Sequence, residues 1–129
     1  MSLEKSITDT LLGYLSASGL TAISSDELTA GQAYPALTVF VTGGKEVAQS
    51  SGVYRVRVLV EVLTDLDEPD ARANHAANVE SVRDLIEDEE SLIAALDCYA
   101  IHDFTLDSDT RDRVSVGSIA FDIIIDSIP

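Results

Sequence analysis

The sequence contains little cysteine and few basic residues, and each shortage excludes a class of protein. A single cysteine, Cys98, among 129 residues rules out an intrachain disulfide and any zinc or iron–sulfur site built from several cysteines. Eight Lys and Arg stand against 23 Asp and Glu, for a formal net charge of −15. This balance argues against direct binding to nucleic acid, whose phosphates need a basic patch, and against docking on anionic lipid.

Long apolar runs and targeting signals are also missing. The longest charge-free stretch, residues 28–44, is interrupted by glycines and a proline and does not predict a membrane-spanning helix. The first five residues lack the charged and apolar regions of a signal peptide. We therefore expect a soluble protein of a reducing cytosol, with residues 1–129 forming one domain.

Hydrophobic periodicity predicts elements in the order α-β-β-α-β-β. The predicted helices cover residues 3–18 and about 69–86, with a short further piece over 91–96 that Ser91 caps, beyond a break at the acidic run 87–90. The predicted strands cover residues 37–41, 53–64, 100–107 and 113 to about 128. We expect an α+β fold with a four-stranded, mostly antiparallel sheet and its helices packed on one face.

The connections carry more specific predictions. Residues 20–34 are expected to form a polar connection, residues 43–52 a long hairpin loop, and residues 108–112 a turn. In the last strand, Val114 and Val116 alternate out of phase with the later apolar residues. A bulge near Gly117-Ser118 would reconcile the two phases.

Two predicted strands carry apolar residues on both faces. A sheet covered by helices on one side should be polar on the other, so the extra apolar residues suggest burial against another subunit. A monomer with some exposed apolar surface is the alternative interpretation. The candidates for a subunit interface are Arg55, Arg57, Leu59, Glu61, Leu63, Asp122 and Ile124.

No residue pattern predicts a catalytic group, a cofactor or a metal. Two aspartate runs share one spacing, Asp65, Asp67 and Asp70 in the first and Asp107, Asp109 and Asp112 in the second. Such oxygens can bind Ca²⁺ or Mg²⁺, but neither run contains the Gly and Glu of a calcium loop, and turn and cap roles are preferred. His75, His102 and Cys98 lack an accompanying nucleophile motif or a basic neighbour and are interpreted as packing residues.

Three segments together suggest a family. They are the N-terminal amphipathic helix with the strand entry Tyr34–Val39, the strand Gly52–Val58 that leads through Thr64-Asp65 into a long helix, and Arg111–Arg113 leading into a final apolar strand. With its size, element order and acidity, the whole chain resembles the tail terminator (tail completion) proteins of long-tailed bacteriophages and prophages.

The resemblance implies a structural virion protein and not an enzyme. Such proteins form homohexameric rings that cap the finished tail tube, stop its polymerisation and join it to the head connector. DNA passes through the ring without specific binding. The expected location is the virion tail, and the bacterial cytoplasm during assembly, with no membrane contact.

Two features bear on this expectation. Residues 65–112 hold fifteen acids and three bases, which would repel DNA in a channel or equally form a solvated outer wall. The loop 43–52, with Lys45, Glu46 and Gln49, is our candidate for contact with a neighbouring ring or tube. A disordered hairpin tip is the alternative for that loop.

Two other classes of function remain open. One is a small acidic α+β adaptor domain of a cellular complex, which would be monomeric or dimeric where a terminator can close a ring. The other is a metal-dependent enzyme that uses the two aspartate runs, which would be stabilised by a divalent metal. We prefer the phage component to the adaptor, and the adaptor to the enzyme.

Overall fold

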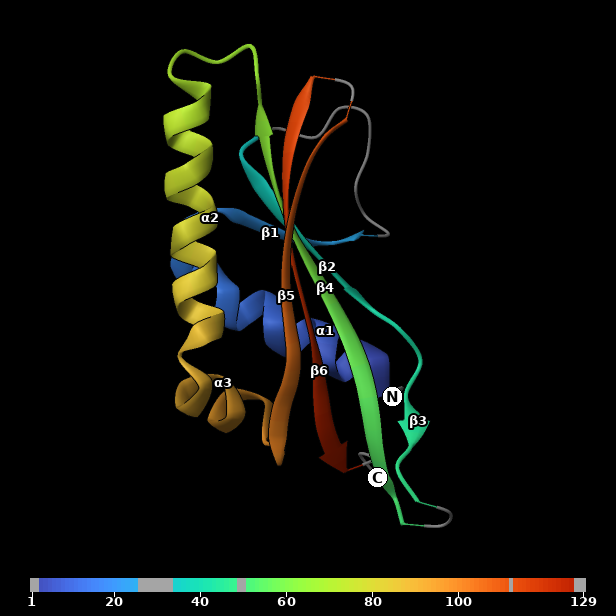
Figure 1. Ribbon diagram of the computed structural model, residues 1–129. Helices are drawn as coiled ribbons and strands as arrows, with labels where there is room; N and C mark the ends of the chain where they lie inside the picture. The colour runs from blue at the N-terminus through green and yellow to red at the C-terminus, as the bar shows by residue number, and fades with distance from the viewer. Residues whose placement is uncertain (1–2, 26–33, 49–50, 112, 127–129) are drawn as a thin grey trace.

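Helices cover one side of a long twisted sheet (Figure 1). The structure, a computed structural model, describes residues 3–25, 34–48, 51–111 and 113–126. The helices are α1 (Leu3–Leu15), the 3₁₀ turn η1 (Ser16–Ser18), α2 (Ala71–Glu87) and α3 (Glu89–Leu96). The strands are β1 (Thr21–Ser24), β2 (Ala36–Val41), β3 (Lys45–Glu46), β4 (Val53–Asp65), β5 (Ala100–Arg111) and β6 (Val114–Asp126).

The first helix follows directly from its apolar spacing. Ile7, Leu11 and Leu15 recur every four residues, so they share one face, and all three are buried against the sheet. The helix tightens into η1 and ends at Gly19, whose positive φ of 86° allows its N–H to donate to the carbonyl of Ser16. The prediction of a helix over residues 3–18 is confirmed.

The fold is α+β as predicted, but its sheet has six strands instead of the four predicted. Its order is β1-β2-β4-β6-β5, with β3 paired to β4 beyond the end of β2. All pairs are antiparallel except β1 with β2. The interpretation of residues 20–34 as only a connection is wrong, because residues 21–24 form an edge strand. Four residues are too few to show a period of two, and this strand exists because β2 offers it a parallel partner.

The core lies between the helices and one face of the sheet. On β4, Val56, Val58, Val60 and Val62 are fully buried, as their alternation predicts. Phe121 on β6 is the largest fully buried side chain and pairs in register with Val58. All three α-helices contribute buried residues to the same cluster, so they cover this one face of the sheet.

The predicted bulge at Gly117-Ser118 is wrong. The pairing of β4 with β6 runs without interruption from Val53–Asp126 to Asp65–Val114. The change of phase instead places Val116 on the helix-free face, beside Leu63. Gly117 serves a different purpose, because a Cβ there would lie 2.6 Å from Cγ2 of Val79 on α2. The glycine lets the helix approach the sheet. The irregularity lies in β5 instead, between His102 and Thr105.

The helical region matches the predicted break but not its capping residue. The chain breaks at Asp88, between α2 and α3, within the acidic run 87–90. The carboxylate of Asp88 accepts from the backbone N–H of Ser91 and caps α3, so Ser91 is the capped residue and not the cap.

The final hairpin is tighter than expected. Residues 108–111 continue β5, and the chain returns in β6 from Val114. The predicted turn over residues 108–112 is therefore wrong for residues 108–111, because pairing with β6 extends the strand through residues that alone favour turns. Asp112 itself lies outside the described residues. In the described part of the chain, no helix is both long and apolar enough to cross a membrane.

Candidate functional site

The face of the sheet away from the helices holds the interface candidates. Strand alternation places Arg55, Arg57, Leu59, Glu61 and Leu63 of β4 on this helix-free face, next to Asp122 and Ile124 of β6. The sequence pattern predicted that these residues share a face, and the register brings the members from both strands together.

Asp122 is the centre of an ion-pair network on this face. Its two carboxylate oxygens accept hydrogen bonds from Nε of Arg55 at 2.8 Å and from Nη1 of Arg57 at 3.0 Å. Arg55 also pairs with Asp103, and Nη2 of Arg57 donates to the hydroxyl of Thr105 on β5. The polar candidates of the face are therefore paired with one another inside one chain.

The pKa of Asp122 reflects this network. Burial, with only 12% of the side chain exposed, raises the pKa, but the hydrogen bonds and charges of Arg55 and Arg57 outweigh it. The net result is a pKa below the ordinary aspartate value, so Asp122 is ionised near neutral pH. A buried carboxylate with two guanidinium partners links β4 to β6 across the face.

Two other interface candidates also have partners within the chain. Glu61 accepts from Nη2 of Arg111 at 2.8 Å, which ties β4 to the far end of β5. Leu63 is only 5% exposed and lies in register between Ala36 and Val116, which are buried as well. In the single chain Leu63 is therefore buried on the helix-free face, and its role in a subunit interface stays a prediction.

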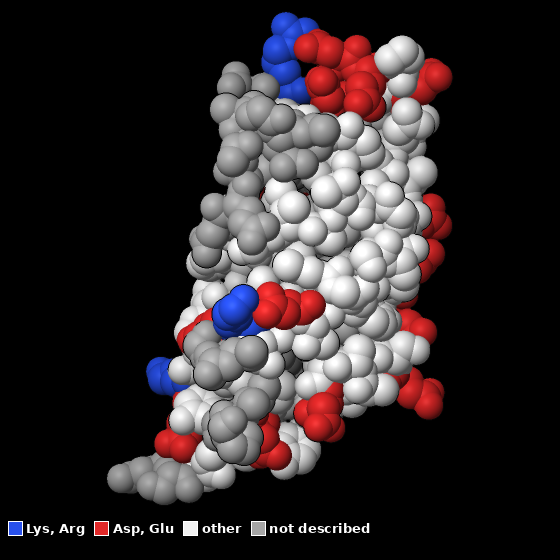
Figure 2. Space-filling model, turned by 180° about the vertical axis from the view of Figure 1, so that it is seen from behind, with Lys and Arg blue, Asp and Glu red and all other residues white. Residues whose placement is uncertain are grey.

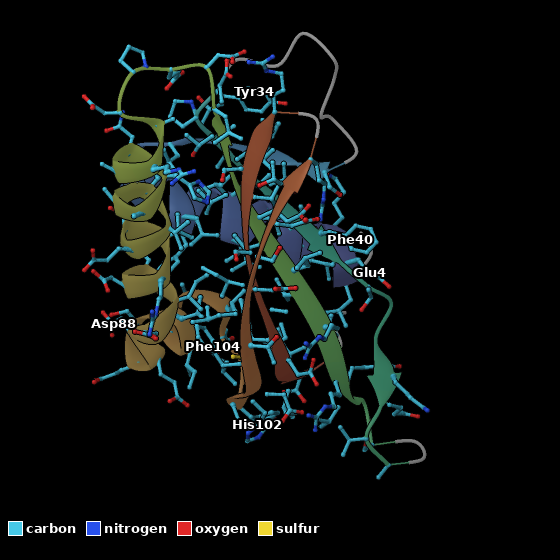
Figure 3. All side chains as sticks on the ribbon, turned by 45° about the horizontal axis from the view of Figure 1, so that its top comes forward. Glu4, Tyr34, Phe40, Asp88, His102 and Phe104 are labelled. Carbon is cyan, nitrogen blue, oxygen red and sulfur yellow. The ribbon has the colours of Figure 1, made fainter. Side chains whose placement is uncertain are left out.

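A partly exposed apolar strip crosses the middle of the helix-free face, with Phe40 exposed and Leu59 and Ala120 half-buried. Phe40 on β2 lies beside Leu59, which lies beside Ala120 on β6. Phe40 is 46% exposed, and Figure 3 shows it on the opposite side of the molecule from Asp88. The sequence interpretation missed Phe40, although it alternates with Val39 and Val41, which line the core-facing side of the same strand.

A groove of about 490 Å³ opens at the β3 end of this face, and we call it the basic groove. Its lining includes Lys45, Glu46, Arg55, Arg57, Asp122 and Ile124. Lys45 and Glu46 form β3, so the predicted loop 43–52 is in part a strand paired to Arg55 and Tyr54. The third loop candidate, Gln49, lies outside the described residues.

The edge strand β5 satisfies some of its own backbone donors. The N–H groups of Ser108 and Thr110 donate to the carboxylates of Asp107 and Asp109, each at 2.8 Å. Exposed strand edges with unpaired N–H groups promote sheet-to-sheet association, and charged side chains oppose it. These aspartates therefore protect the edge, and the turn and cap roles predicted for them are wrong because both lie within β5.

We expect the double variant Asp107→Ala, Asp109→Ala to associate through this edge. Two freed N–H groups and two lost charges should raise the rate of aggregation at high concentration by about tenfold. Light scattering over time measures this rate. Glu80→Ala with Asp84→Ala removes the same charge from exposed positions of α2 and should leave the rate unchanged. Equal rates for the two double variants would contradict the protective role.

The remaining candidates, His75, Cys98 and His102, have different surroundings. His75 on α2 shares a hydrogen bond of 2.8 Å with the hydroxyl of Thr64, and burial lowers its pKa. Burial is also the main cause that raises the pKa of the Cys98 thiol, which makes it a weak nucleophile near neutral pH. His102 is exposed on β5, so its interpretation as a packing residue is wrong.

The aspartate runs do not converge in the part of the chain that the structure describes. Asp65 accepts from the backbone N–H of Asp67 at 2.9 Å, and Asp67 pairs with Arg113. Among the described residues, no three His, Cys, Asp or Glu side chains are grouped so that they could hold a metal ion. Asp112 of the second run lies outside the described residues.

The charged side chains are distributed unevenly over the surface. Figure 2 views the molecule from behind and shows a broad area of uncharged side chains, with acids gathered at its upper end and along one margin.

Comparison of the sequence with family models finds no match, and comparison with curated proteins finds no significant relative.

Proposed function

We propose that this protein is a structural component of a bacteriophage or prophage tail, a terminator that closes into a ring on the tail tube. The observation that carries the proposal is the helix-free face of the sheet. It combines the partly exposed apolar strip Phe40, Leu59 and Ala120 with an ordered ion-pair network around Asp122. A contact surface between subunits has this composition, an apolar centre with polar groups around it.

The acidity of the chain supports the same proposal. Residues 65–112 carry fifteen acids and three bases, and they form α2, α3 and β5 with their connections. A ring through which DNA moves should repel phosphates so that transit is not slowed by binding. The homohexameric state, the tube and the head connector as partners, and the virion location all belong to this proposal.

Removing the protein from the phage or prophage that encodes it tests the function. Electron microscopy of the particles should show tubes of uncontrolled length that are not joined to heads, because the cap that stops polymerisation is missing. Supplying the wild-type chain should restore joined tails. Particles with normal tails in its absence would exclude the role.

The adaptor function is the second candidate, and one observation favours it. Arg55, Arg57 and Arg111 all find carboxylate partners within the chain, so the polar part of the helix-free face is stable in a monomer. The mass in solution separates the two, because an adaptor alone should be a monomer or dimer at every concentration and a terminator should be able to form a ring.

A further inference from the structure

The basic groove differs in charge from other hollows on the described surface. Three cations and two carboxylates line it. The hollow between α2 and β5 has one cation and four carboxylates, and the hollow between α1 and β2 has one cation and two. On a chain with a net charge of −15, three cations in one groove identify the place where a carboxylate-rich surface would be attracted.

Lys45 is the cation of this groove whose charge is not paired with a carboxylate of the described residues. Arg55 and Arg57 are already joined to Asp122, which holds their guanidinium groups in place along the groove. Lys45 is exposed, and within the described residues it forms no ion pair. An incoming carboxylate would therefore meet the ammonium group of Lys45 in the same groove as two ordered guanidinium groups.

A matching acidic surface lies on the same chain. The hinge between α2 and α3 presents four consecutive exposed acids, Glu87, Asp88, Glu89 and Glu90. Glu87 pairs with Arg83, and Asp88 caps α3. Glu89 and Glu90 project from the first turn of α3 and form no ion pair with the described residues.

The two surfaces cannot meet within one molecule. Figure 1 shows α3 at the lower left and β3 at the lower right, at the same end of the molecule, with the long strands of the sheet between them. Figure 3 places Asp88 of the hinge far from the β3 side as well. A contact between two different patches is heterologous, and its repetition closes a ring when the rotation between neighbouring copies divides a full turn evenly.

We propose that the basic groove of one copy binds the acidic α2–α3 hinge of a second copy, with Lys45 facing Glu90 or Glu89. The inference rests on the proposed ring and defines which surfaces join its subunits. The occupant is a second copy because charge complementarity and separate placement of the two surfaces are both present in this chain.

Charge reversal at Lys45 tests the contact. Lys45→Glu should weaken self-association by about tenfold at low salt, since it replaces attraction by repulsion at the groove. Adding salt to about 0.5 M should reduce the difference in self-association between the variant and wild type to less than about threefold, because exposed charges are screened. Sedimentation equilibrium over a range of concentrations measures both values.

Two variants serve as controls. Arg72→Glu makes the same change in net charge on the exposed first turn of α2, where an acid suits the helix dipole, and should leave self-association within about twofold of wild type. The double variant Lys45→Glu, Glu90→Lys restores an opposite pair at the wild-type net charge and should recover most of the lost association.

The outcomes separate the contact from the proposed function. Equal weakening by Lys45→Glu and Arg72→Glu would show a general effect of net charge and overturn the contact. A strictly monomeric wild-type chain at all concentrations and salts would also overturn it. In either case the terminator role is tested separately by the particle experiment. If normal tails require this protein but still form with Lys45→Glu, the function is supported and the contact is rejected.

Discussion

Replacing Phe121 by Ala should lower the free energy of unfolding by about 3–5 kcal/mol. Phe121 is fully buried between the helices and the sheet, so the substitution removes apolar contacts and leaves a cavity that rigid neighbours cannot fill. Urea unfolding followed by circular dichroism measures the change, since the chain has no tryptophan for fluorescence.

Phe40→Ala is the matched control for this prediction. It makes the same chemical change on the helix-free face, where the side chain is already 46% exposed, and should lower the free energy of unfolding by less than about 1 kcal/mol. Equal losses for the two variants would mean that the apolar core does not lie on the Phe121 side of the sheet.

Asp122→Asn should lower the free energy of unfolding by about 1–3 kcal/mol at neutral pH. The amide keeps the shape of the side chain but removes the charge that holds Arg55 and Arg57. The effect stays below that of a fully buried ion pair because both arginines are more than 40% exposed and keep contact with water.

The pH dependence of this loss has a definite sign. The folded-state pKa of Asp122 lies below its unfolded value, so the unfolded chain takes up the proton more readily. The stabilisation is therefore complete above the unfolded pKa of about 4 and disappears as pH falls through the folded pKa. The gap between wild type and Asp122→Asn should close over this acid range in urea unfolding.

Asp103→Asn is the control within the same network. Asp103 pairs with Arg55, but 63% of its side chain is exposed, so its substitution should change the free energy of unfolding by less than about 1 kcal/mol. A gap for Asp122→Asn that persists well below the folded pKa would show that packing, and not the carboxylate charge, carries the effect.

The sequence alone determined the elements whose local pattern is strong. The spacing of Ile7, Leu11 and Leu15 predicts α1, and the strict alternation from Val53 to Thr64 predicts β4 and its buried face. The acidic run 87–90 predicts the break between α2 and α3. In each case the side chains within one element contain the full signal, because burial of one face needs only a period.

The interface candidates show what strand alternation determines and what it leaves open. Alternation alone places Arg55, Arg57 and Leu59 on one face of their strand. It does not show that Asp122 lies between the two arginines, because that depends on the register of β4 against β6. It also does not show that Leu63 is buried, since Ala36 and Val116 come from two other strands.

Only the tertiary structure decided the edges of the sheet and the role of Gly117. The short strands β1 and β3 have no periodic signal and form where β2 and β4 leave hydrogen-bonding groups open. The local sequence around Gly117 suggests a bulge. The residue is a glycine because Val79 of α2, nearly forty residues earlier in the chain, packs closely against it. Contacts between segments far apart in the chain do not appear in a local sequence pattern. In this protein such contacts form the basic groove, the edges of the sheet and the close packing of α2 against it.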